Sequence, residues 1–182
     1  MEKNKEIIEI EYNLKTIRYD NWINDVLFSF NWWFLLFLTI VPWMIWWKYV
    51  KRDRFTPIII YGVLITIYSI ILDDFGTSLQ LWVYQFQLVP ITPRLNTIDL
   101  AVMPVTYMFI YQMFRKWKAF MIAQTIMAFG AAFIIEPLFV KLDIYKIINW
   151  NLFLSFFIYI ILGVFNKLIV DKIDKYNLNK LT

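Results

Sequence analysis

The feature that most constrains this chain is a series of long apolar runs that take up most of its 182 residues. Each run is close to the roughly 20 helical residues that cross the hydrocarbon layer of a membrane. The sequence predicts five such spans, at residues 30–49, 55–72, 97–114, 118–135 and 151–170. Because 60% of all residues are hydrophobic and little chain is left over, we predict an all-α fold. It is one integral membrane helical bundle over residues 30–170, without a second, soluble domain.

The two ends of the chain are more polar than this bundle. Residues 1–29 are predicted to form an amphipathic arm, because four apolar residues repeat at helical spacing and suit a helix on the membrane surface. They are Ile7, Ile10, Leu14 and Ile17. Residues 8–14 also alternate in polarity, so a strand is the alternative. Residues 171–182 are predicted to be a charged, frayed tail.

The segment between the second and third spans, residues 71–100, is called the cap segment here. It contains Trp82 and Tyr84 among many apolar residues, and a disordered loop would have little use for them. We therefore predict an ordered loop at the membrane interface. Pro137 is expected to end the fourth span, because proline is a stop signal for a helix. The linker that follows, 138–150, is expected to lie flat in the interface.

Small and polar residues mark the faces of two spans that should point into the bundle. Those of the second span recur every three or four residues, and those of the fifth fall within one sector of about 80 to 120 degrees, which places each set on one side of a helix. They are Gly62, Thr66, Ser69 and Asp73 in the second span, and Asn151, Ser155, Tyr159 and Asn166 in the fifth.

The Lys and Arg residues indicate an orientation, because positive residues near span ends favour the cytoplasmic side. Eleven of them fall on the side that holds the C-terminus, and seven on the side that holds the N-terminus. The predicted topology therefore has the N-terminus outside, the C-terminus in the cytoplasm and the cap segment on the outer surface.

The composition excludes several kinds of chemistry. Cys and His are both absent, so a thiolate nucleophile, a His general base and the usual Cys/His zinc site are impossible. The net charge of +4 follows the loops of a membrane protein and forms no basic stripe with interleaved aromatic residues. We expect no nucleic-acid partner and no cofactor.

A candidate polar site lies at the predicted outer end of the spans. Its members are Asp73, Asp74, Trp82, Tyr84, Arg94, Asp99 and Glu136. One interpretation is structural: the acids cap helices and pair with nearby Lys and Arg residues. A second is a site that binds or modifies the headgroup of a lipid or isoprenoid. A third is a divalent cation held by the four carboxylates, since Mg²⁺ and Ca²⁺ prefer carboxylate oxygens.

Two resemblances bear on these alternatives. The Trp82-x-Tyr84 loop, the Ile98-Asp99 helix start and Glu136 resemble the small membrane-embedded carotenoid cyclases, whose carboxylates at span ends protonate a polyene. This chain departs from them because it lacks their paired Glu-Glu motif.

The second resemblance covers residues 30–165 and rests on the order of several strings. They are NWWFLL, VPWMIWWK, LDDFGTSLQLWVYQFQLVPITPRLNTIDL, MPVTYMFIYQ, WKAF, EPLFVKLDIYKIINW and SFFIYI. They resemble an uncharacterised family of small multi-pass membrane proteins from spore-forming Firmicutes. The resemblance implies a bacterial cytoplasmic membrane location and a role linked to sporulation, without an assigned activity.

From the sequence we therefore predict a multi-pass bacterial membrane protein that acts as a structural or partner-binding component. Its expected partners are membrane lipids and either another membrane protein or a second copy of the chain. An enzyme or binder acting on a lipid or isoprenoid headgroup at the interface is the alternative.

Overall fold

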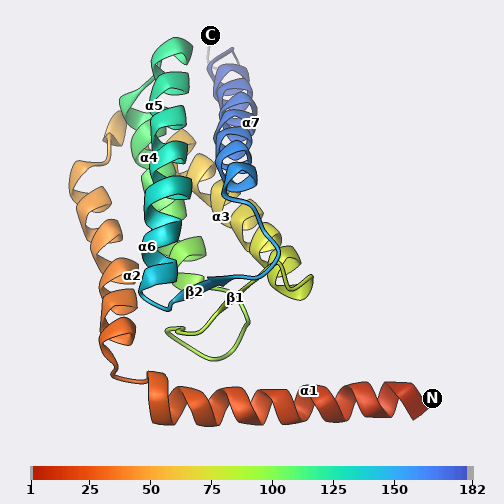
Figure 1. Cartoon of the computed structure of the whole chain (residues 1–182). Helices are drawn as coiled ribbons and strands as arrows, with labels where there is room; N and C mark the ends of the chain where they lie inside the picture. The colour runs from red at the N-terminus through yellow and green to blue at the C-terminus, as the bar shows by residue number, and fades with distance from the viewer. Residues whose placement is uncertain (1, 180–182) are drawn as a thin grey trace.

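In the computed structural model, which describes residues 2–179, the chain forms a helical bundle with one helix set apart from it (Figure 1). The helices are α1 (Glu2–Asn21), α2 (Phe30–Tyr49), α3 (Phe55–Ser78), α4 (Met103–Met113), α5 (Trp117–Gly130), α6 (Glu136–Lys141) and α7 (Leu152–Asn179). Four short helical turns join them: η1 (Trp22–Val26), η2 (Arg52–Arg54), η3 (Ile98–Val102) and η4 (Ala131–Ile135). The two strands, β1 (Trp82–Tyr84) and β2 (Tyr145–Ile147), are three residues each. The all-α prediction is confirmed.

Four helical segments are long and apolar enough to cross a membrane. They are Phe30–Tyr49, Arg52–Ser78, Trp117–Lys141 and Leu152–Tyr176, which correspond to the first, second, fourth and fifth predicted spans. The segment at the third position, Ile98–Met113, is apolar but shorter. At about 1.5 Å per residue it reaches roughly 24 Å, which is less than the roughly 30 Å of membrane hydrocarbon. A fifth crossing therefore stays a prediction.

The centre of the bundle is the packing of α3 against α4. Tyr61 and Tyr111 stack with their ring centroids 4.4 Å apart. Beside them, a Cβ atom on Gly62 would lie only 2.4 Å from the Met108 sulfur. Glycine at this position lets the two helices approach closely, as small residues do between membrane helices.

The faces predicted to point inward do so. Most of the small and polar residues of the second span are buried, and so are two of those in the fifth, where bundle helices surround them. The buried members are Gly62, Ser69, Asp73, Ser155 and Asn166. A periodicity of three to four residues was sufficient to identify the side of each helix that packs.

The prediction that Pro137 ends the fourth span is wrong. The helix continues through η4 and α6 as far as Lys141, with Pro137 in the first turn of α6. Proline has no N–H to donate to the preceding turn, and the wider π-helical turn of Ala131–Ile135 lies where that bond would be missing. The segment 138–150 is thus part helix and part strand, and its position in the interface stays a prediction.

A strand pair that the sequence did not reveal holds the cap segment in place, and its position at a membrane interface stays a prediction. β1 pairs with β2 in antiparallel orientation, with Trp82 opposite Ile147 and Tyr84 opposite Tyr145. The indole of Trp32 in α2 donates a hydrogen bond to the Leu88 carbonyl oxygen at 3.0 Å. These contacts attach the cap segment to the end of the bundle from two sides.

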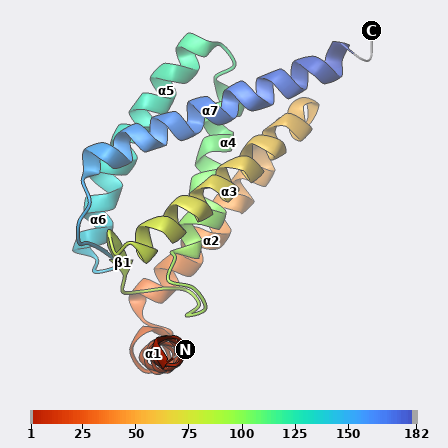
Figure 2. The same ribbon diagram turned by 90° about the vertical axis from the view of Figure 1, so that its right-hand side faces the viewer.

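The N-terminal arm is the helix α1, so the helix prediction is confirmed over the strand. None of its residues is buried, and it runs across the end of the bundle instead of along it (Figures 1 and 2). Its position on a membrane surface remains a prediction. At the other end of the chain, α7 continues as a helix to Asn179, and fraying of the tail stays a prediction. Residues 180–182 of the predicted tail lie outside the described residues.

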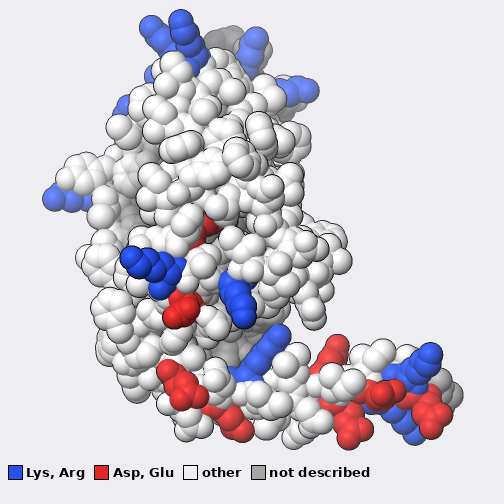
Figure 3. Space-filling view, in the orientation of Figure 1, with Lys and Arg blue, Asp and Glu red and all other residues white. Residues whose placement is uncertain are grey.

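The chain ends and turns divide between the two ends of the bundle (Figures 1 and 2). The α2–α3 turn, the α4–α5 turn and the C-terminal end of α7 lie at the end opposite α1. Lys and Arg side chains gather at this end in the space-filling view, whereas at the other end and along α1 they are mixed with Asp and Glu side chains (Figure 3). The strand pair and the cap segment lie at the end near α1.

Candidate functional site

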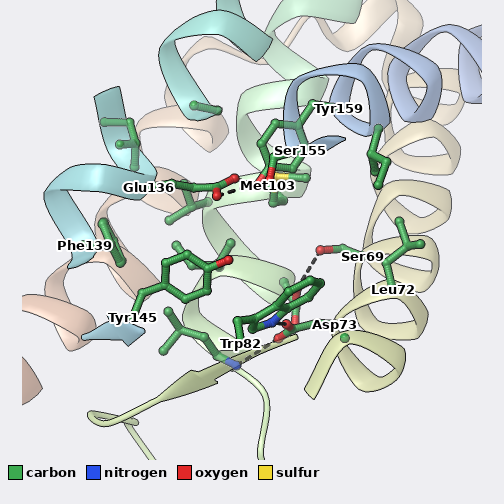
Figure 4. A pocket seen from close by; sticks show the side chains of 18 of the residues that line it. Ser69, Leu72, Asp73, Trp82, Met103, Glu136, Phe139, Tyr145, Ser155 and Tyr159 are labelled. Carbon is green, nitrogen blue, oxygen red and sulfur yellow. Dashed lines mark hydrogen bonds between the residues drawn. The ribbon is translucent and has the colours of Figure 1, made fainter. Parts of the chain in front are cut away.

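A cavity of about 500 Å³ lies inside the bundle, above the strand pair (Figure 4). Side chains from α3, α4, α7, the α5–η4–α6 segment and both strands form its walls. Most of these side chains are apolar, and the polar ones come from distant parts of the chain. The polar lining residues include Ser69, Asp73, Tyr84, Asp99, Thr106, Tyr107, Glu136, Tyr145, Ser155 and Tyr159.

Asp73 lies on one side of the cavity, near the end of α3, and is the centre of a hydrogen-bond network. Its Oδ1 accepts hydrogen bonds from the Trp82 indole N–H at 2.7 Å and from the Tyr84 hydroxyl at 2.8 Å. Its Oδ2 accepts from the Leu95 backbone N–H at 3.1 Å. The carboxylate thus connects the end of α3 to β1 and to Leu95, which lie 9 to 22 residues further along the chain.

Gly76 makes this network possible. A Cβ atom there would lie 1.9 Å from Cζ2 of the Trp82 indole, so any side chain larger than hydrogen would displace the ring. Gly76 is one turn after Asp73 on α3, and the indole lies over the glycine while its N–H reaches the carboxylate. The sequence alone gave no indication of this contact.

Asp99 lies beside Asp73, at the start of the η3–α4 segment. Its Oδ1 accepts a hydrogen bond from the Ser69 hydroxyl at 2.6 Å. Its Oδ2 is buried and has no hydrogen-bond partner among the described residues. The carboxyl groups of Asp73 and Asp99 are close enough to interact directly. A buried carboxyl oxygen without a donor is costly, so this pair is a site of unsatisfied hydrogen-bonding capacity.

Glu136 lies on another wall of the cavity, at the start of α6. Its Oε1 accepts a hydrogen bond from the Tyr159 hydroxyl at 2.6 Å, and its Oε2 accepts from Ser155 at 3.2 Å. The Trp150 indole N–H donates in turn to Ser155 Oγ at 2.8 Å. The π-helical turn η4 immediately before Glu136 is a kind of distortion that often occurs at functional sites.

Asp74 and Arg94 belong to a different environment. They form an ion pair at 2.9 Å, and half of the Asp74 side chain is exposed. Neither residue lines the cavity. An exposed ion pair of this kind is worth about 0–1 kcal/mol. It therefore adds only a little to the attachment of the cap segment to the end of α3.

Tyr145 is the functional candidate that the sequence reasoning missed. It comes from β2 and is 93% buried, and its hydroxyl points into the cavity between Glu136 and Asp73 (Figure 4). Among the described residues its hydroxyl has no hydrogen-bond partner, in contrast to those of Tyr84 and Tyr159. A single tyrosine in a short apolar linker carries no signal in the sequence. Pairing of β2 with β1 is what brings it here.

The phenols of the strand pair lie outside the helical segments that could cross a membrane. Burial raises the pKa of Tyr84 well above its usual range, and the nearby Asp73 charge adds to this. Burial likewise raises the pKa of Tyr145, with further contributions from Glu136 and Asp73. Both hydroxyls therefore keep their protons at neutral pH and can donate hydrogen bonds.

The carboxyls of the predicted site do not form one cluster. Asp73 and Asp99 lie together, Glu136 lies apart from them, and Asp74 is turned toward Arg94. In the part of the chain that the structure describes, no three acidic side chains are arranged to hold a metal ion. The geometry therefore gives no support to a cation shared by all four carboxylates.

The chain was also compared with known proteins. No protein-family model matches it, and no curated protein or solved structure is significantly similar to it. The fold and the site therefore define it only as a helical bundle with an apolar, acid-lined cavity at one end. The chemistry of that cavity is the feature of the structure that bears on function.

Proposed function

We propose that this chain is a multi-pass membrane protein that binds an elongated apolar molecule of lipid or isoprenoid type. The cavity inside the bundle is the single observation that carries the proposal. Its volume of about 500 Å³ falls within the roughly 300–1,000 Å³ of small-molecule sites. Such sites are mostly apolar with a few convergent polar groups, and this cavity has the same composition.

The entrance of the cavity supports a ligand that arrives from the membrane. Three apolar residues that line the cavity keep a large part of their surface exposed. They are Leu72, Phe75 and Ile135, with exposed fractions of 39%, 65% and 43%. Each belongs to a helix that is apolar enough to cross a membrane, so these side chains would face lipid tails. An apolar molecule could enter here without passing through water.

A structural or partner-binding role is the second candidate, and α1 is the observation that favours it. Its apolar residues are exposed, including Ile7, Ile10 and Ile17, and no other part of the bundle covers them. Membrane lipids, a membrane-protein partner or a second copy of the chain would cover this surface. The role linked to sporulation that the family resemblance implies belongs to this candidate.

We further propose a topology of five crossings in the cytoplasmic membrane of a bacterium, with the N-terminus outside. The chain direction alternates through α2, α3, α4, α5–α6 and α7, and the basic turns share one end (Figures 2 and 3). By the positive-inside rule that end would be cytoplasmic and the cavity would lie toward the outer leaflet.

The topology can be tested because the chain has no native cysteine. Asp53→Cys lies in the α2–α3 turn, and Ile91→Cys lies in the cap segment, where Ile91 is 82% exposed. We expect an impermeant maleimide to label only Ile91→Cys in intact cells, and both variants after the membrane is opened. Labelling of both variants in intact cells would contradict the proposed topology.

Binding can be tested by identifying small molecules that copurify in mild detergent, using mass spectrometry. Gly130 lines the cavity, and a Cβ atom there would meet no other atom within 4 Å. We therefore expect Gly130→Phe to place a ring in free space and to reduce the copurified molecule severalfold. Ala123→Phe, on the same helix but outside the cavity, is the matched control. Equal recovery from both variants, or no apolar molecule with the native chain, would refute the proposal.

A further inference from the structure

We propose that the polar end of the bound molecule is a hydrogen-bond donor, a hydroxyl or an ammonium group, that lies between Tyr145 and Glu136. This inference rests on the proposed function, because it names the class of molecule that the same cavity would take. It separates that class from phosphate-bearing lipids, which are the commonest polar lipids of a membrane. Two properties of the cavity wall favour such a donor: the hydrogen-bonding capacity that its side chains leave unused, and the charge of its acidic residues.

The acids of the cavity have more acceptor sites than their neighbours occupy. A carboxylate offers about four acceptor positions on its two oxygens. Glu136 accepts one hydrogen bond on each oxygen, which is half of that capacity. Asp99 also has an oxygen without a partner among the described residues, but that oxygen is buried, so the capacity within reach of a ligand belongs to Glu136. A ligand that donates hydrogen bonds would use this capacity.

The donors of the cavity, in contrast, are almost all occupied. The hydroxyls of Tyr84 and Tyr159 and the indole of Trp82 already donate to Asp73 or Glu136. Tyr145 and Thr106 are the exceptions, since neither hydroxyl has a hydrogen-bond partner in the described structure. The Tyr145 side chain is more than nine-tenths buried, and its hydroxyl is aimed into the cavity (Figure 4). A hydroxyl both donates and accepts. It can therefore accept a hydrogen bond from a ligand hydroxyl or ammonium group, or donate one to a ligand oxygen.

The charges at the wall favour the same class of ligand. Of the described residues that line the cavity, three are acidic and none is Lys or Arg. Arg94, the nearest base in the cap segment, is paired with Asp74 outside the cavity. A buried phosphate is normally held by Arg, Lys or backbone N–H groups, because its charge must be paired. Here it would face carboxylates instead, whereas an ammonium group would find a counter-charge.

The test uses the purified chain in a sterol-based detergent, which has no linear alkyl tail to compete for the cavity. Binding of farnesol, farnesylamine and farnesyl monophosphate is measured by isothermal titration calorimetry, so that only the polar end differs. Geraniol and geranylgeraniol extend the series to shorter and longer chains. We expect the alcohol and the amine to bind at least tenfold more tightly than the phosphate.

The results separate this inference from the proposed function. Phosphate binding as tight as that of the alcohol and the amine would overturn the inference but would support an apolar binding site. No binding by any compound at any chain length would overturn the proposed function, and the inference with it. Tighter binding of the alcohol and the amine supports both.

Variants of the wall provide the second measurement. Tyr145→Phe removes only the hydroxyl and keeps the ring that stacks on Tyr84, with centroids 5.5 Å apart. Since one net hydrogen bond is worth a factor of about five in affinity, we expect about fivefold weaker binding of farnesol. Tyr68→Phe, which lies on α3 outside the cavity, is the matched control and should leave binding unchanged. Equal affinities of the two variants for farnesol would contradict the proposal that the polar end of the ligand contacts Tyr145.

Glu136→Gln tests the charge at the same wall. The amide keeps the size of the side chain but removes its negative charge. We expect the preference for farnesylamine over farnesyl monophosphate to fall by about tenfold or more. An unchanged preference would overturn the electrostatic part of the inference. The melting temperature of each variant is measured as well, so that loss of folding is recognised as such.

Discussion

The contact between Gly76 and Trp82 makes the sharpest prediction about what holds the acid network together. We expect Gly76→Ala to destabilise the chain, because the new methyl group would lie 1.9 Å from the indole. The indole must then move, which also breaks its 2.7 Å hydrogen bond to Asp73. The result would be a loosened cap segment and an Asp73 carboxylate with one donor fewer.

The expected loss of stability combines two costs and one smaller gain. Overpacking of a well-packed site costs roughly 1–3 kcal/mol. A hydrogen bond to a charged group contributes roughly 1.5–3 kcal/mol. The helix preference for alanine over glycine opposes them by roughly 1 kcal/mol. We therefore expect a net loss of about 2–4 kcal/mol in the free energy of unfolding, measured by denaturant titration in detergent.

Two further variants make the prediction specific to the clash. Gly130→Ala is the matched control, since a methyl group there would meet no atom within 4 Å and should leave stability unchanged or slightly raised. In the double variant Gly76→Ala with Trp82→Ala the clash is absent. The two substitutions should therefore cost less together than the sum of their separate effects. A Gly76→Ala protein as stable as the native chain, or fully additive effects, would refute the reasoning.

Three other predictions concern the ends of the bundle. Lys167 is buried, pairs with Asp171 at 2.9 Å and lies against three aromatic rings, so Lys167→Ala should lower the free energy of unfolding by about 1–3 kcal/mol in denaturant titration. Asp74→Asn should cost less than about 1 kcal/mol and leave farnesol affinity unchanged, because its ion pair with Arg94 is partly exposed and lies outside the cavity. The folded-state pKa of Tyr84 lies above that of the unfolded chain, so its contribution is fully present below about pH 10 and is lost as the pH rises further. Melting temperatures between pH 9 and pH 11 should therefore fall less steeply for Tyr84→Phe than for the native chain.

Local sequence patterns were sufficient for most of the helices. Apolar runs of about 20 residues located the four long helices, since burial in lipid depends on length and hydropathy. The spacing of Ser69 and Asp73 identified the inward side of α3. Local patterns failed at Pro137, where a π-helical turn allows the helix to continue through a residue that usually ends one.

The candidate site was predictable only in part. Asp73, Asp99 and Glu136 were singled out as acids at one end of the bundle, and they do line one cavity. Nothing in the sequence distinguished Asp74, which forms an exposed ion pair, from its neighbour Asp73. Tyr145 was missed because it is one aromatic residue in a short linker, and aromatic residues are frequent throughout this chain.

The sequence by itself determined that this protein is helical and apolar enough to lie in a membrane, with the acids of the candidate site toward one end. Those properties depend on runs of neighbouring residues. The tertiary structure alone decided which acids face a cavity, which one is turned away, and that a tyrosine from β2 lies between them. Those properties depend on the pairing of β1 with β2, more than 60 residues apart, and on the space that Gly76 leaves for Trp82.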